Sequence, residues 1–394
     1  MLKRIITLTL IMITMLALVA EAAELKVEVK KAKTWRPELS IGLKMATQVK
    51  ISVDQASKII DVKSKSRIRN VKANEELLIA NEGGKIKING KEIKNTNIEL
   101  RLKDLETVKD MKVKIDGKEY LGSVRLTVKG NKLTVINIIT TEEYLRGVIP
   151  KEMLPSFHEE ALKAQAVAAR TFALMNRKRH SKDGYDLCST THCQAYTGTA
   201  DISDKTDKAI FDTYGEVIQY KGKMILAPFH SDSGGMTENS LDAWSLDCPY
   251  LRAVPEIKKL TSPWNVKMEI AEFGKKLEAA KKGVGDVKFI KSTPLEIGKL
   301  TEDRSASGRI KYIVVYGSNG DAKITGKEMR DIFKLKSTLF EISITNKEVV
   351  INGYGWGHGV GMSQNGAEEF ANHSYTYDKI LAKYYTGTNL KRIY

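Results

Sequence analysis

The sequence predicts a mixed α+β fold, with a β-rich N-terminal part followed by a helix-containing core. Short alternating apolar segments, separated by turn dipeptides, fill residues 24–137. A long run of small apolar residues follows, as expected of a buried helix. Gly-rich loops occur later in the chain. We therefore expect a β-rich domain at 24–137, a core at 138–254, an α/β insertion at 255–346 and the rest of the core at 347–394.

The first residues have the pattern of a targeting segment. Lys3 and Arg4 precede an uncharged apolar run from Ile5 to Val19, and Ala20-Glu21-Ala22 resembles a cleavage signal. The run is short for a membrane span, which needs about 20 apolar residues. We expect residues 1–22 to be a signal peptide, with an uncleaved N-terminal anchor as the alternative. The mature protein should act outside the cytoplasm, either secreted, periplasmic or associated with the cell wall or membrane.

The chain is strongly basic, with a formal net charge of +16 over 394 residues. Positive charge attracts anionic partners. For an exported chain we expect anionic wall polymers or a membrane surface rather than nucleic acid. The alternative is that the positive charge serves no specific partner, because the lysines are spread along the chain and not clustered.

The N-terminal part contains seven segments that read as strands. They are Leu39–Met45, Val49–Val53, Leu77–Ala80, Lys85–Ile88, Ile98–Leu102, Met111–Ile115 and Leu133–Ile139. Turn signals such as Asn89-Gly90 and Asp116-Gly117 favour hairpins between them. Few polar groups converge here, so we expect a scaffold or wall-facing domain.

The core begins with two predicted helices. A short one should run from Thr141 to Val148 and stop at Pro150. The S-x-x-E pattern at Ser156–Glu159 predicts a capping box that starts a long helix at Phe157–Arg179. Its middle, Ala164–Ala169, is small and apolar on nearly every side, which predicts burial.

Lys163 and Arg170 lie seven residues apart and therefore share one face of this long helix. Cations on a mostly buried helix need anionic or hydrogen-bonding partners.

Later elements are predicted more coarsely. We expect a hairpin at Val217–His230, helices at Met268–Lys282, Gly326–Phe333, Gln364–Ala371 and Tyr377–Tyr385, and a strand at Arg309–Gly317.

Glu152 lies between Pro150 and Pro155, just before the long helix. A helix N-terminus stabilises a carboxylate as the anion, so an acid role would require desolvation. An ordinary solvated turn residue is the alternative.

His180, Cys188, His192 and Cys193 form a cluster of metal-binding residue types. Thiolate and imidazole at these spacings suit a structural zinc. The spacing of the thiols is looser than C-x2-C, and the neighbouring ligands His192 and Cys193 are geometrically awkward. A disulfide between Cys188 and Cys193 is an equal alternative in an exported protein, and two free buried thiols are a further one.

Two Gly-rich loops complete the candidate sites. The loop from His230 to Gly235 contains Ser231, Asp232 and Ser233 but no G-x-S-x-G elbow, so a serine hydrolase is not indicated. In the loop from Gly353 to Ser363, glycines permit close approach of a ligand, and Trp356 can stack on a sugar while His358 donates a hydrogen bond. Plain Gly turns are the alternative for both.

Taken in order, these motifs resemble the SpoIID/LytB (stage II sporulation protein D) family. The resemblance rests on Glu143–Val148, Glu152-Met153 with Pro155, Glu160–Thr171, Tyr196-Thr197-Gly198, His230-Ser231 with Ser233-Gly234-Gly235, Gly355–Gln364 and Tyr384-Tyr385. Weaker matches at Gly42-Leu43, Ser262-Pro263-Trp264 and Leu335–Thr338 extend it to most of the mature chain.

The resemblance implies a lytic transglycosylase that acts on peptidoglycan glycan strands already stripped of stem peptides. The glutamate of the family's E-M-x-P motif, the proposed acid/base, corresponds to Glu152. In this chain the motif reads Glu152-Met153-Leu154-Pro155, which is one residue longer than the E-M-P form. Zinc-binding members imply His180, Cys188, His192 and Cys193 as ligands. The matching motif residues give the expected substrate-binding set: Lys163, Gln165, Arg170, Tyr196, Ser231, Ser233, Gly234, Gly235, Trp356 and His358.

The same resemblance keeps a non-enzymatic alternative open. Other relatives are amidase enhancers, which would bind the wall and stimulate a partner amidase. The family's Q-W-G-A motif also reads Gln364-Asn365-Gly366-Ala367 here, which removes an aromatic ring.

Overall fold

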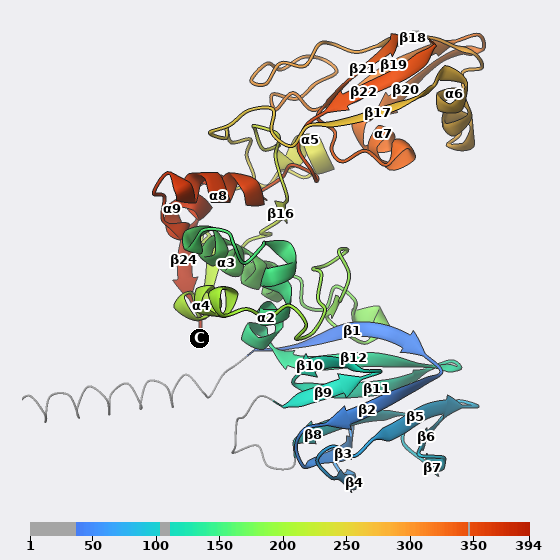
Figure 1. Ribbon diagram of the computed structural model, residues 1–394, viewed down its shortest axis with the longest axis vertical. Coiled ribbons are helices and arrows are strands. Elements are labelled where there is room, and N and C mark those ends of the chain that lie inside the picture. The colour runs from blue at the N-terminus through green and yellow to red at the C-terminus, as the bar shows by residue number, and fades with distance from the viewer. Residues whose placement is uncertain (1–36, 103–110, 346) are drawn as a thin grey trace, which may run out of the picture.

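The computed structural model describes residues 37–102, 111–345 and 347–394 and confirms the mixed α+β class. Its N-terminal part is built from two sheets (Figure 1). The first has the order β13 (Leu187–Cys188), β1 (Glu38–Ala46), β12 (Lys132–Thr140), β11 (Ser123–Lys129), β8 (Asn97–Leu102), β3 (Ser57–Asp61) and β4 (Arg67–Val71). The second has the order β10 (Lys118–Leu121), β9 (Lys112–Ile115), β2 (Gln48–Val53), β5 (Leu77–Glu82), β6 (Lys85–Ile88) and β7 (Lys91–Ile93).

All seven predicted strands of this part are present, with ends that agree within one or two residues. Strands β3, β4, β7, β10 and β11 were not predicted, because most are short or have mixed burial. Alternate residues of β1 and β2 face a core that continues into the helical part. The β-rich part therefore supports the helices directly.

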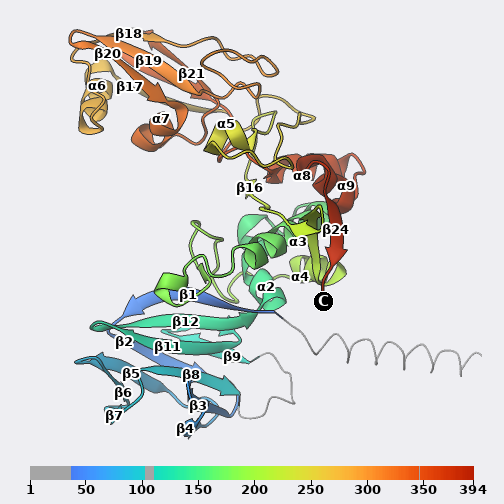
Figure 2. The same ribbon diagram turned by 180° about the vertical axis from the view of Figure 1, so that it is seen from behind.

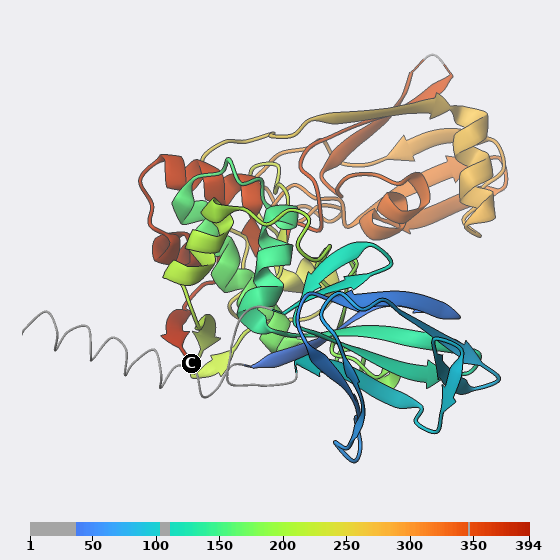
Figure 3. The same ribbon diagram turned by 60° about the horizontal axis from the view of Figure 1, so that its bottom comes forward.

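The helical core is arranged around α3 (Glu159–Met175). It contacts α2 (Thr141–Glu152), α4 (Asp204–Asp212), α8 (Gln364–Asn372), α9 (Tyr377–Tyr384) and β14 (Glu216–Tyr220). Residues Ala164–Ala169 are buried, as predicted, because the small side chains let these neighbours approach on every side. Figure 3 shows this group of helices beside the N-terminal sheets.

Three predictions about the helix ends were wrong. Helix α2 does not stop at Pro150 but continues to Glu152, with a capping box at Thr140 and Glu143. Helix α3 has no capping box at Ser156–Glu159, because His158 is its N-cap and accepts a hydrogen bond from the backbone N–H of Glu160. It ends at Met175, before Arg179.

The segment expected as an α/β insertion has a hydrophobic core of its own. One sheet has the order β17 (Trp264–Glu269), β22 (Glu348–Gly353) and β21 (Phe340–Thr345), and the other β18 (Val287–Lys291), β19 (Tyr312–Gly317) and β20 (Gly320–Thr325). Helices α6 (Ile270–Ala279) and α7 (Gly326–Phe333) accompany them. Figure 2 shows α7 on the side of this part that faces the core.

Short elements connect the parts. The predicted hairpin is reduced to β14 and β15 (Lys223–Met224), and β24 (Asn389–Arg392) pairs with β14. Strands β16 (Phe229–His230) and β23 (Met362–Ser363) pair in parallel where the chain leaves the core and returns to it. Helix α5 (Ser240–Trp244) and the 3-10 turn η1 (Ser181–Asp183) complete the set.

The described ranges contain no helix that is both long and apolar enough to cross a membrane. The expected signal peptide at residues 1–22 lies outside them. The exact domain boundaries stay a prediction.

Candidate functional site

Segments far apart in the sequence enclose one hollow of about 540 Å³. Its walls come from the end of α2, the segment after β13, strand β16, the Gly-rich loop before β23, and α7. The predicted site residues that line it are Glu152, His192, Cys193, Ser231, Trp356 and His358. Four of the sequence motifs therefore meet at one place.

Glu152 is the last residue of α2, not a residue at a helix N-terminus as expected. The following Met153 is buried, whereas Leu154 is 63% exposed. The side chain of the extra residue, Leu154, thus lies at the protein surface, and Glu152 still lines the hollow.

The environment of Glu152 favours a protonated carboxyl group. Burial raises the pKa of Glu152, and hydrogen bonds from the backbone N–H of Ala195 and the side chain of Gln364 oppose that rise. The Ala195 nitrogen lies 3.2 Å from Oε1. Among the described residues that line the hollow, Glu152 is the only acidic one. The hollow thus contains one carboxyl group suited to donating a proton.

His180, Cys188, His192 and Cys193 come together next to Glu152, with one potential ligand atom from each within 4.8 Å of the others. Cys188 Sγ lies 3.6 Å from His192 Nδ1, and Cys193 Sγ lies 3.5 Å from His180 Nε2. Ligands around a tetrahedral zinc with bonds of about 2.0–2.3 Å are separated by about 3.3–3.8 Å. The four side chains therefore fit zinc.

The surroundings of the cluster also suit a metal. The Asp183 carboxylate lies 3.5 Å from His180 Nδ1, which leaves Nε2 directed toward Cys193. Burial opposes ionisation of Cys188, but hydrogen bonds with Thr190 and His192 dominate and lower its pKa to about 6. Both cysteines are free thiols in this structure. The adjacent residues His192 and Cys193 both reach the cluster, although their spacing had suggested difficulty.

Two histidines lie against each other at the hollow, with ring centroids 5.3 Å apart. His358 Nδ1 accepts a hydrogen bond from the Val360 backbone N–H, and burial lowers the pKa of His358 to about 4. His230 Nδ1 lies 3.2 Å from the Val360 carbonyl oxygen, and burial lowers the pKa of His230 well below its usual value. Both imidazoles are therefore neutral at physiological pH.

Two tryptophans form the rim. Trp356 is 52% exposed, and the Lys336 ammonium lies 4.6 Å from its ring centroid. Trp244 is 41% exposed and contacts the His358 ring edge-on, with centroids 5.2 Å apart. An exposed ring beside a polar hollow can stack on a sugar, as expected for Trp356.

Ser233, Gly234 and Gly235 do not line this hollow, contrary to expectation; all three are buried and bond to neighbouring residues of the protein. Ser233 Oγ donates to Glu256, and the Gly234 backbone N–H donates to Asp232. Gly234 has φ 79° and Gly235 has φ 123°, so they form a turn that other residues adopt only with strain.

Lys163 and Arg170 are also placed away from the hollow. Arg170 is fully buried and forms two hydrogen bonds, of 2.7 and 2.8 Å, with the Glu142 carboxylate. Lys163 forms ion pairs with Glu159, Glu160 and Asp212. Both cations thus have anionic partners within this chain, and a direct role toward substrate is not supported.

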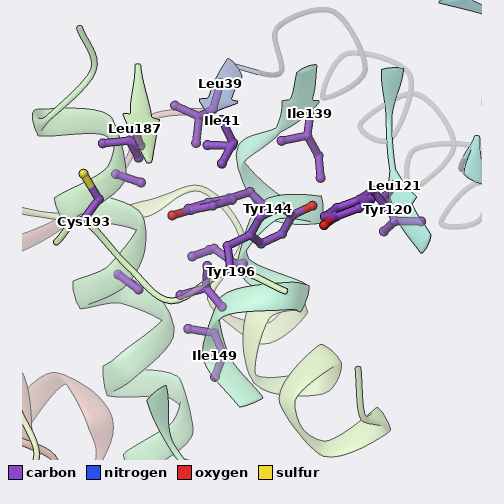
Figure 4. Close-up of a cluster of buried hydrophobic side chains, with 14 of the residues drawn as sticks. Leu39, Ile41, Tyr120, Leu121, Ile139, Tyr144, Ile149, Leu187, Cys193 and Tyr196 are labelled. Atoms are coloured by element: carbon purple, nitrogen blue, oxygen red, sulfur yellow. The ribbon is translucent and has the colours of Figure 1, made fainter. Parts of the chain in front are cut away.

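Tyr196 and Gln165 belong to the interior beneath the site. The Tyr196 hydroxyl donates to Asn137 Oδ1 at 2.8 Å, and its ring packs against Tyr144 (Figure 4). Gln165 is buried and contacts Gln364, whose amide nitrogen is 3.5 Å from Gln165 Oε1. Gln165 therefore contacts Gln364, the residue whose side chain lowers the pKa of Glu152.

Several residues that line the hollow were not predicted as site residues. They include Gln364, His230, Trp244, Arg179 and Arg330. Gln364 and His230 stand inside the motifs that carry the family resemblance, which was a usable signal. Nothing in the local sequence distinguished Trp244, Arg179 or Arg330 from surface residues.

Comparisons with known proteins show the family to which this chain is similar. A family model described as "Stage II sporulation protein" matches residues 129–220, which include Glu152 and the four candidate metal ligands. The stage II sporulation protein D of Bacillus subtilis (strain 168) is 32% identical over 276 residues, which cover 64% of this chain and 74% of that protein. The chain belongs to the stage II sporulation protein D (SpoIID) family.

Two further matches extend along this SpoIID-family protein. The amidase enhancer of Bacillus subtilis is 31% identical over 77% of this chain, which spans about half (48%) of that protein's length. An uncharacterized protein of Brachyspira hyodysenteriae is 30% identical over 86% of this chain and 89% of its own length. A second model, "Domain of unknown function (DUF8618)", matches residues 248–361, which contain the expected insertion and the Trp356 loop.

Proposed function

We propose that this protein is a lytic transglycosylase that cleaves peptide-stripped peptidoglycan strands, with Glu152 as its single acid and base. The observation that carries the proposal is the partly buried Glu152 carboxyl group, with a raised pKa, in a hollow of about 540 Å³. The exposed Trp356 ring at the rim offers a stacking surface for a sugar.

One carboxyl group favours this reaction over hydrolysis. Hydrolytic glycosidases generally use two carboxylates on opposite sides of the bond. Among the described lining residues Glu152 has no such partner. A lytic transglycosylase uses a hydroxyl of its own substrate as nucleophile, so one group can give a proton and then take one back.

The proposed steps balance around Glu152. Its carboxyl group protonates the glycosidic oxygen that links N-acetylmuramic acid to the next sugar, and the bond from that oxygen to C1 breaks. The C6 hydroxyl oxygen then bonds to C1 and its proton returns to Glu152. The product is a 1,6-anhydro end, and the carboxyl group is ready for another cycle. Gln364 and the Ala195 N–H stabilise the anion between the steps.

The test compares Glu152→Gln with unmutated protein on peptide-free glycan strands, with mass spectrometry for 1,6-anhydro products. Loss of the acid should lower the rate by about 10²- to 10⁴-fold. Glu296→Gln, an exposed change in the insertion, is the matched control and should retain activity. If the unmutated protein binds strands and yields no anhydro product, the proposal is wrong.

A structural zinc is proposed for the cluster beside Glu152. His180, Cys188, His192 and Cys193 would hold it, and four protein ligands leave no open position for a catalytic water. When bound, zinc supplies a crosslink that fixes the loop from Cys188 to Ala195. This chain's own residues hold the Ala195 N–H against Glu152.

An amidase-enhancing role is the second candidate. The observation that favours it is the likeness to a protein named amidase enhancer. In that role the protein would bind glycan strands outside the cytoplasm and stimulate a partner amidase. Addition of the Glu152→Gln variant to an amidase assay on intact walls separates amidase enhancement from glycan cleavage. Undiminished stimulation would show enhancement without glycan cleavage.

A further inference from the structure

Two arginines border the hollow without a carboxylate partner. Arg179 follows α3, and Arg330 belongs to α7 of the insertion. Over residues 37–102, 111–345 and 347–394, neither guanidinium group forms an ion pair. By contrast, Arg170 and Arg146 are paired with Glu142 and Asp207.

Arg330 is held in place by its own segment. Its Nε donates to the Leu335 carbonyl oxygen at 3.3 Å, and the Leu335 backbone N–H donates to the Arg330 carbonyl at 3.0 Å. The next residue, Lys336, accepts a hydrogen bond of 2.9 Å from the Gly357 N–H of the Gly-rich loop. Within the described residues the two terminal nitrogens of Arg330 keep no protein acceptor.

The hollow consequently carries excess positive charge. Arg179 and Arg330 line it, Lys336 lies over Trp356, and the one acidic lining residue among those described is Glu152 with its raised pKa. Burial lowers the pKa of Arg330, as expected of a partly desolvated cation. Such a group is stabilised when an anion binds beside it.

The proposed substrate supplies a matching anion. Each N-acetylmuramic acid carries a lactyl group. In an unprocessed strand the carboxyl group of this lactyl group forms an amide bond with the stem peptide. Hydrolysis of that amide releases a carboxylate. A guanidinium group binds a carboxylate through two parallel charge-assisted hydrogen bonds, which a neutral amide cannot accept.

We infer that Arg330, assisted by Arg179, binds the free lactyl carboxylate and thereby makes the hollow selective for strands whose stem peptides have been removed. The inference rests on the proposed function. It also gives the domain of unknown function a role, because α7 lies within that domain and contributes Arg330 to the wall of the hollow. The reaction class that supplies the substrate is amide hydrolysis.

The experiment measures binding by isothermal titration calorimetry in the Glu152→Gln background, where strands are not consumed. One ligand is peptide-free strands, and the other is the same strands with every lactyl carboxylate converted to its methylamide. The parent should bind the carboxylate form about tenfold more tightly, as expected for charge-assisted hydrogen bonds. Adding Arg330→Gln should abolish the preference for the carboxylate form. The affinity for the methylamide form should stay within about twofold of the parent's, because a side chain that contacts only the carboxylate contributes nothing to binding of the neutral ligand.

Three controls make the result decisive. Arg392→Gln removes an exposed arginine that pairs with Glu216 away from the hollow, and should keep the full preference. Arg330→Lys keeps the charge without the paired hydrogen-bond donors and should keep part of it, even if the Gln variant folds poorly. Arg179→Gln should reduce the preference less than Arg330→Gln.

An equal affinity of the parent for both ligands, or a preference that survives Arg330→Gln, would overturn the inference. Failure of the proposed function looks different: the unmutated protein would give no 1,6-anhydro product on peptide-free strands, whichever ligand binds better.

Discussion

The backbone N–H of Ala195 donates a 3.2 Å hydrogen bond to Oε1 of Glu152. Ala195 lies two residues after Cys193, so the loop that brings the candidate metal ligands together also delivers this donor. One short segment therefore carries both the candidate ligand Cys193 and the N–H donor that opposes the rise in the pKa of Glu152.

The first prediction concerns the pH dependence of strand cleavage. Glu152 must be protonated to act as the acid, and burial raises its pKa, so kcat/KM should fall as pH rises through a value above 4.5. The Gln364 side chain lowers that pKa by stabilising the anion. Gln364→Met should therefore move the descending limb to higher pH, as measured by product formation between pH 4 and 9.

Gln219→Met, a change in β14 outside the hollow, is the control for this profile. A limb that stays in place in Gln364→Met, or moves to lower pH, would contradict the assignment of Glu152 as the titrating acid.

The second prediction concerns the metal. Protein purified without added zinc should contain about one zinc per chain by elemental analysis, and Cys188→Ser should lose most of it. The control is Cys248→Ser, because Cys248 is also a thiol but lies outside the cluster. Zinc-free protein with a mass two daltons below that of the dithiol would instead identify a disulfide between Cys188 and Cys193.

The third prediction separates a structural from a substrate-binding role for Arg170. Removal of one partner of its buried pair with Glu142 should cost about 3–5 kcal/mol in the free energy of unfolding. Arg170→Met and Glu142→Gln should each show this loss in urea denaturation, and the double variant should lose less than the sum.

Lys163→Met is the comparison, since its ion pairs are partly solvated and should contribute about 1 kcal/mol or less. A stable Arg170→Met protein that has lost strand binding would favour the substrate role expected from the motif.

The fourth prediction is a pH-dependent stability. Glu256 accepts hydrogen bonds from Tyr384 and Ser233, and burial raises its pKa to about 7. The native state then binds this proton more tightly than the unfolded chain, so its stabilising contribution is complete below about pH 4.5 and is lost as pH rises to about 7. The melting temperature should fall by a few degrees between pH 5 and 8, and Glu256→Gln should reduce that fall.

Glu272→Gln, an exposed change on α6, should leave the pH dependence as it is in the unmutated protein. A Glu256→Gln protein with the full unmutated dependence would show that another group is responsible.

Local patterns predicted much of the fold. Alternation and turn dipeptides located seven strands, and the Ala-rich run of α3 predicted a buried helix. The end of α2 was missed because Pro150 tends to stop a helix, yet one lost hydrogen bond was tolerated within this buried packing. The capping box at Ser156–Glu159 was wrong because α3 begins at Glu159, so that His158 rather than Ser156 is the residue that caps it.

The sequence by itself determined the fold class, the family and the residue types of the metal cluster, since these depend on periodicity and ordered motifs. Only the tertiary structure decided which motif residues face the hollow. Some motif residues have the right types but bond to other residues of this chain instead of facing the hollow; these are Lys163, Arg170 and the turn at Ser233–Gly235. Desolvation of Glu152, and the approach of Arg330 from a separate part of the chain, depend on packing between distant segments. For that reason Glu152 resembles a solvated turn residue in the sequence and a candidate acid in the folded protein.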